Sequence, residues 1–193
     1  MKPDTKGYSN DGLKLGFNWG FTADFFLMEN YSIATGFDVV FLNGRMEMPH
    51  RVDIDSVKIN EGILVRTYHL KYIQLPLTLK MRTNELGKVR IFGQIGLGTN
   101  FLIGAKADDE FTYGSSSETE NKLDIYDDMK FMRESLIIGG GIEYSLGGST
   151  SIMASILFNN GFTDILKGSN TVDQSLKNKA QANYITVEVG IVF

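Results

Sequence analysis

The chain ends in Tyr184-Ile185-Thr186-Val187-Glu188-Val189-Gly190-Ile191-Val192-Phe193, where every odd position carries an apolar side chain. The even positions include a threonine, a glutamate and a glycine. Successive side chains of a β-strand point to opposite faces of a sheet, so a period of two indicates a strand with one apolar face. The stretch therefore predicts a β-strand over 184–193.

The same alternation recurs upstream in the segments 13–25, 31–41, 73–82, 89–103, 132–146 and 152–162. No stretch shows the 3.6-residue apolar period of an amphipathic helix. Most runs span 10 to 15 residues, whereas ordinary globular strands have about 5 to 6. About 9 to 11 tilted residues cross the hydrocarbon of a membrane. The pattern predicts an all-β, antiparallel up-and-down transmembrane barrel with about seven strands in this chain.

The polar faces of the predicted strands contain many glycines, such as Gly96, Gly98, Gly139 and Gly141. Glycine weakens a strand and has little use on a solvated surface, but it fits the crowded interior of a narrow barrel. These faces also carry charges of both signs, and we predict a charge network in the lumen made of Lys14, Asp24, Asp38, Lys80, Arg82, Arg90, Arg133, Glu143 and Glu188. The apolar faces are expected to meet lipid through Leu15, Phe17, Val39, Leu77, Ile95, Ile138, Ile156 and Val189.

Composition narrows the classes of function. A chain of 193 residues is expected to form one domain over 1–193. Its formal net charge of −4 argues against a nucleic-acid partner, because binding to phosphates needs a basic surface. The lack of cysteine excludes disulfides and thiolate metal sites. No apolar run approaches the roughly 18 residues of a membrane-spanning helix.

The connections between the predicted strands alternate in length. Short ones lie at 26–30, 83–87 and 147–150, and long ones at about 43–66, 106–131 and 163–182. Outer-membrane barrels have short periplasmic turns and long extracellular loops, so we expect the long connections and residues 1–11 outside, with Phe193 on the periplasmic side. Single-chain bacterial barrels have an even strand count. We therefore expect that one ascending strand and a signal peptide are missing before Met1.

A distinctive strand motif occurs at Tyr72-Ile73-Gln74-Leu75-Pro76-Leu77-Thr78-Leu79-Lys80. It resembles the strand with a leading tyrosine, a central Pro-Leu pair and a closing Leu-Lys pair in the PorT-like outer-membrane β-barrels of Bacteroidetes. The order of the other elements is also similar to that family, namely Tyr31-Ser32-Ile33-Ala34-Thr35-Gly36-Phe37, Gly93-Gln94-Ile95-Gly96-Leu97-Gly98, Gly139-Gly140-Gly141-Ile142-Glu143-Tyr144 and Asn159-Asn160-Gly161-Phe162. The resemblance implies an eight-stranded barrel in the cell outer membrane.

The resemblance also implies a functional context. The namesake of that family is implicated in type IX secretion, so we expect a non-enzymatic integral membrane barrel that anchors or assists an envelope or type IX secretion assembly. Its expected partners are membrane lipid and other envelope proteins, with no cofactor. The alternatives are a ligand-binding barrel, a loop-mediated binding module and a soluble lipocalin-like carrier.

Two groups of residues are candidates for other chemistry. His50 and His69 are the two histidines, and neither has the sequence context of a catalytic site. The second long connection is acidic, and its candidate calcium ligands are Asp108, Asp109, Asp127 and Asp128. A solvated loop without metal is the alternative. Charges in the lumen are expected to pair with one another, because a barrel near eight strands is filled by its own side chains.

Overall fold

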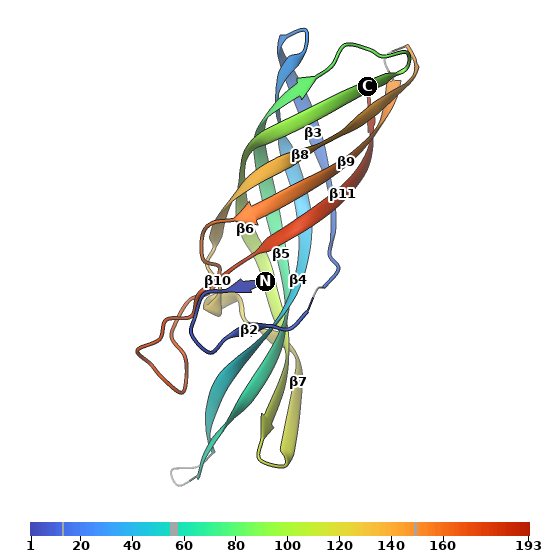
Figure 1. Cartoon of the computed structure of the whole chain (residues 1–193). Helices are drawn as coiled ribbons and strands as arrows, with labels where there is room; N and C mark the ends of the chain where they lie inside the picture. The colour runs from blue at the N-terminus through green and yellow to red at the C-terminus, as the bar shows by residue number, and fades with distance from the viewer. Residues whose placement is uncertain (13, 55–57, 149) are drawn as a thin grey trace.

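The structure is a computed structural model that describes residues 1–12, 14–54, 58–148 and 150–193. It consists almost entirely of antiparallel strands that twist around a common long axis (Figure 1). Among the described residues, no helix is long and apolar enough to cross a membrane.

The main sheet contains seven long strands within the described residues, each antiparallel to its neighbours. Their spatial order is β3 (Phe17–Met28), β4 (Tyr31–Ile54), β5 (Lys58–Arg82), β6 (Val89–Tyr113), β8 (Met132–Gly147), β9 (Thr150–Gly161) and β11 (Asn183–Val192). The predicted all-β antiparallel fold is confirmed, and each predicted strand corresponds to one of these elements.

Shorter elements gather at one half of the molecule. β7 (Ser116–Asp124) returns along β6 as a hairpin, and the 3₁₀ turn η1 (Tyr126–Asp128) follows it. β1 (Lys2–Pro3) pairs with β10 (Ala180–Gln181), and β2 (Ser9–Asn10) pairs with β4. The C-terminus and the short turns lie at the opposite end (Figure 1).

Two of the three expected long loops are largely strand. β4 and β5 continue through most of 43–66, and β6 with β7 fills most of 106–131. The connection 163–182 contains only the two-residue β10 and isolated bridges. The description of the first two connections as loops was therefore wrong, and the side-chain pattern explains why.

The outward face changes character along β4. Over 31–49 the odd-numbered residues point outward, since most of the even-numbered ones are buried. Val39 and Phe41 are outward and apolar, whereas Arg45 and Glu47 are outward and charged. Alternation thus continues past Phe41, but its sense is reversed. The apolar outer face therefore ends at Phe41, although the strand itself continues. A prediction based on that face places the end of the strand too early.

Beyond this reversal the inward side chains form the main apolar core. Its members on β4, β5 and β6 include Met46, Met48, Leu64, Tyr68, Leu70, Ala107 and Phe111. It is covered by Ile125, Met129, Ile165, Leu166 and Ala180 from the segments around η1 and β10. The covered half has the polar-out, apolar-in arrangement of a protein in water, so we call it the polar-faced module.

The other half has an apolar outer surface. The predicted lipid-facing residues Leu15, Ile156 and Val189 are 93%, 62% and 77% exposed. Such a continuous apolar band is suited to hydrocarbon and not to water. Within the described residues no ladder joins the edge strands β3 and β11, so hydrogen bonds do not close the sheet.

Replacing Ile156 by arginine tests the lipid-facing surface. The charge would lie in hydrocarbon, so the free energy of unfolding from lipid vesicles should fall by about 2–4 kcal/mol. The fluorescence of Trp19 during urea titration reports the transition. A Thr67→Arg variant is the matched control, because Thr67 lies on the outward face of β5 beyond the reversal. An equal loss in both variants would contradict the assigned boundary.

Candidate functional site

A buried ion cluster fills the lumen near the short-turn end. Lys80 Nζ lies 2.7 Å from Glu143 Oε1 and 3.2 Å from Asp24 Oδ2. Arg82 bonds to Asp24 and also lies 3.8 Å from Glu143 Oε2. Burial of charge is tolerable only with paired, hydrogen-bonded partners. Two cations and two carboxylates meet this condition together, and each cation contacts both acids.

A second polar layer surrounds Arg133, which is fully buried. Its guanidinium donates to Asn159 Oδ1 at 2.5 Å and to Asn100 Oδ1 at 3.2 Å. It also lies over the rings of Tyr72 and Tyr184, with 5.9 and 5.3 Å to their centroids. Neutral oxygens and aromatic faces therefore replace the carboxylates that we expected to pair with this arginine.

Two further carboxylates face the lumen from β4 and β11. Asp38 accepts a hydrogen bond from Gln74 at 3.4 Å, and Glu188 accepts one from Ser155 at 3.1 Å. Among the described residues, neither acid forms an ion pair. The charge of Lys80 in the ion cluster nevertheless acts on Glu188.

Not all predicted lumen residues are there. Arg90 pairs with Glu85 at 3.2 Å, and both side chains are more than 40% exposed. Lys14 precedes β3 and is exposed. The alternation of odd and even positions predicted that both side chains point inward. Lys14, however, lies before its strand begins. Arg90 lies at the rim, where a long side chain reaches water.

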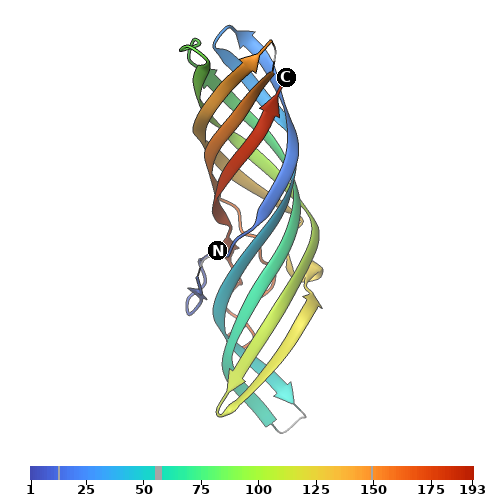
Figure 2. The same cartoon turned by 90° about the vertical axis from the view of Figure 1, so that its right-hand side faces the viewer.

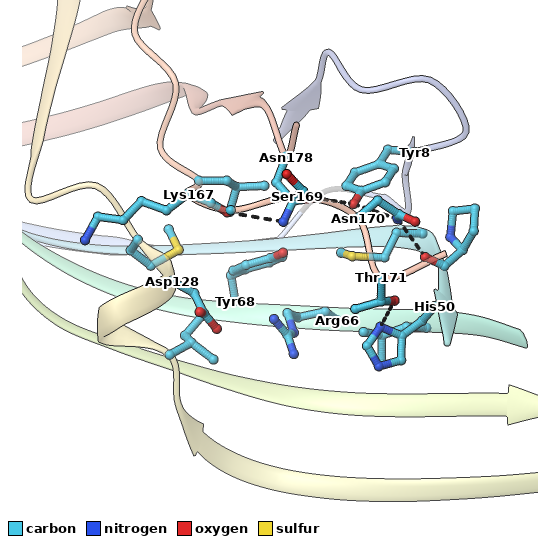
Figure 3. A pocket seen from close by; sticks show the side chains of 17 residues that line it. Tyr8, His50, Arg66, Tyr68, Asp128, Lys167, Ser169, Asn170, Thr171 and Asn178 are labelled. Carbon is cyan, nitrogen blue, oxygen red and sulfur yellow. Dashed lines mark hydrogen bonds between the residues drawn. The ribbon is translucent and has the colours of Figure 1, made fainter. Parts of the chain in front are cut away.

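A pocket of about 230 Å³ lies in the polar-faced module (Figure 3). Arg66 and Tyr68 of β5 form its floor, while Asn170 and Thr171 come from the connection before β10. Tyr8 reaches it from the N-terminal segment. The pocket thus joins three parts of the chain that are far apart in sequence, and sequence reasoning gave no signal for it.

Hydrogen bonds hold the walls of the pocket together. Tyr8 donates to Asn178 Oδ1 at 2.5 Å and accepts from Asn170 Nδ2 at 3.0 Å. Thr171 Oγ1 lies 3.1 Å from His50 Nδ1. Burial lowers the pKa of His50, and the nearby Arg66 charge lowers it further, which favours the neutral imidazole.

The pocket contains charged side chains of both signs. Arg66 makes a two-point contact with Asp109, with Nε and Nη2 at 2.7 and 2.6 Å from its oxygens. Asp128 and Lys167 lie on the opposite wall. Their polar groups and the apolar side chains of Leu64 and Met129 form a lining suited to a small, partly polar molecule.

The candidate calcium ligands do not come together. Asp108 lies on the outer face, where His69 Nε2 is 3.0 Å away, and Asp109 points inward to Arg66. Asp127 and Asp128 belong to η1. Within the described ranges, no three histidine or acidic side chains are placed to hold a metal ion.

The comparisons with known proteins give one match. The family model described as outer membrane protein beta-barrel domain matches residues 1–191. No curated protein and no solved structure matches the chain.

Replacing Glu143 by glutamine tests the ion cluster. The change leaves Lys80 and Arg82 with one carboxylate in a buried site, and breaking such a pair costs about 3–5 kcal/mol of unfolding free energy. Urea unfolding in lipid vesicles measures it. The control is Glu85→Gln, which removes an exposed pair and should cost less than about 1 kcal/mol. Similar small losses in both variants would show that the cluster is not a buried network.

Proposed function

The chain belongs to the outer membrane protein β-barrel domain family, and from this premise we propose that it is a non-conducting anchor in the outer membrane. In this proposal the anchor holds the polar-faced module on the extracellular side of the membrane. The observation that carries this proposal is the continuation of β4, β5 and β6 beyond the apolar band as a folded sheet with its own core. A barrel that served only as a pore would not need this rigid extension.

The filled lumen supports the absence of conduction. Lys80 and Glu143 are each 3% exposed, and Arg133 is completely buried. Their side chains occupy the space that a channel would need. A barrel of this small size is filled by its own residues and leaves no aqueous path.

The environments of the two histidines differ from that of a catalytic triad. His69 lies between Asn43 Oδ1 and Asp108 Oδ2, at 2.9 and 3.0 Å. His50 lies next to the hydroxyl of Thr171. A hydrolytic triad needs one histidine that joins a carboxylate to a hydroxyl. Among the hydrogen bonds of the described residues, neither histidine makes this connection.

We further propose that the anchored partner is an envelope protein that docks on the outward polar face of the module. This face carries Arg45, Glu47, Thr67 and His69. A type IX secretion assembly is the specific context suggested by the PorT-like sequence motifs. That context rests on the resemblance alone.

Binding of a small ligand is the second candidate function, and the pocket at Arg66 favours it. A ligand there would raise the unfolding midpoint by mass action, and Arg66→Met would abolish that rise. The anchor role requires no such ligand.

Planar-bilayer recording tests the closed lumen. The purified protein should give no stable large conductance at neutral pH, because its own side chains fill the interior. A porin inserted under the same conditions is the positive control. A reproducible open level from this protein would overturn the non-conducting assignment.

Photo-crosslinking in the native host tests the anchor role. A photoreactive residue at Thr67 should form an adduct with one envelope protein, and the same residue at lipid-facing Ile156 should not. The captured protein should leave the outer-membrane fraction when the barrel gene is deleted. Retention of every cross-linked protein after deletion would contradict anchoring.

A further inference from the structure

The pocket at Arg66 has the size of a small molecule. The N-terminal segment and the connection 163–182 lie beside the sheet near the middle of the molecule, and both contribute to the pocket (Figure 2). Its volume of about 230 Å³ is below the roughly 300–1,000 Å³ of pockets for drug-sized ligands. A cavity of about 150 Å³ holds one benzene molecule. The pocket therefore has room for a single six-membered ring with its substituents.

The charges around this pocket are balanced. Arg66 is held by Asp109 through hydrogen bonds of 2.7 and 2.6 Å. Asp128 and Lys167 add one charge of each sign to the lining. Burial and the Arg66 charge lower the pKa of His50, which favours its neutral form. A charged ligand would meet like charge as well as opposite charge, so the pocket favours a molecule without net charge.

A zwitterion such as a free amino acid fits less well. Its carboxylate would need a cation that is free to bind it, whereas the guanidinium of Arg66 already binds Asp109. The ammonium of Lys167 points away from the pocket and donates to the carbonyl of Asp127 at 3.3 Å (Figure 3). The ligand that these groups favour is therefore neutral at every atom.

The polar groups of the lining divide into two sets. The Tyr8 hydroxyl and the Asn170 amide bind each other, and they also bind Asn178 and the carbonyl of Pro49. They hold the walls in place. The hydroxyl of Tyr68 and the carboxylate of Asp128 instead face the cavity (Figure 3).

These inward groups suit hydroxyls on the ligand. Asp128 offers only acceptors, Arg66 offers only donors, and the hydroxyl of Tyr68 can do either. A hydroxyl both donates and accepts, so a molecule with several of them can satisfy all three side chains. Leu64 and Met129 line the same cavity and offer an apolar surface. A sugar ring combines hydroxyls at its edge with C–H groups on its faces.

We propose that the pocket binds one unit of a neutral sugar, with Asp128 accepting and Arg66 donating hydrogen bonds to its ring hydroxyls. The hydroxyl of Tyr68 binds a further hydroxyl of the sugar, and one C–H face of the ring packs on Leu64 and Met129. The inference rests on the second candidate function, binding of a small ligand at this pocket, and names the chemical class of that ligand.

Saturation-transfer NMR on the full chain in lipid vesicles free of glycolipid tests the proposal. The probes are D-glucose, D-galactose, D-mannose and N-acetyl-D-glucosamine, each titrated alone, with L-leucine as the zwitterion and inorganic phosphate as the anion. At least one sugar should show saturable transfer. Its Kd should stay constant from about 0.05 to 0.5 M salt, because salt screens only interactions between charges.

An Asp128→Asn variant tests the placement of the sugar. The change keeps the size of the side chain and removes its charge, and hydrogen bonds to a charged acceptor are the stronger ones. The Kd for the sugar should rise about tenfold. The matched control is Asp127→Asn, at the neighbouring residue of η1 outside the pocket lining, which should leave the Kd unchanged. The fluorescence of Trp19 verifies that both variants are folded.

The outcomes separate the sugar from the pocket. Transfer to leucine or phosphate and to no sugar would overturn the sugar assignment and keep the pocket as a ligand site. Transfer to none of the probes would overturn the second candidate function together with the sugar. Equal losses of affinity in Asp127→Asn and Asp128→Asn would overturn the assigned contact.

Discussion

The structure depends on one constraint, which is that hydrocarbon offers no hydrogen-bond partners to a peptide backbone. Every N–H and C=O group in the apolar band must therefore pair with another strand. Long antiparallel strands joined by short turns satisfy this requirement, and the register from Ile33–Leu79 to Val39–Ile73 stays constant across β4 and β5. The outward side chains are then free to be apolar, because the backbone behind them is already satisfied.

A narrow, strongly curved sheet imposes a second condition on its interior. Backbones approach so closely that a Cβ atom at Gly96 would collide with the Leu77 carbonyl, and one at Gly139 with the Ile156 carbonyl. These glycines allow the close approach of neighbouring strands, and Gly161 leaves room for Arg133, whose Nε would lie 3.1 Å from a Cβ atom there. Glycines and charged side chains thus share the limited space of the lumen. This explains why both occur at the inward-facing positions of the strands.

The parts of the fold that depend on the alternation of side chains along a strand were predictable from the sequence. The strands, the outward position of Ile156 and the pairing of Lys80 with Asp24 and Glu143 could all be inferred from alternation and charge. The neutral partners of Arg133 could not, because they depend on which residues from β6 and β9 reach the same depth. The pocket could not be predicted either, since Tyr8 and Asn178 meet only through tertiary packing.

The reversal at Phe41 shows what the alternation pattern itself encodes. A period of two states only that two faces differ, and the solvent outside decides which face is apolar. On one side of Phe41 the outer medium is lipid, so the apolar side chains of β4 point outward and the lumen is ionic. On the other side the outer medium is water, so Met46 and Met48 point inward and the core is apolar. One continuous strand therefore carries two inverted patterns, and the residue at which they exchange marks the membrane surface.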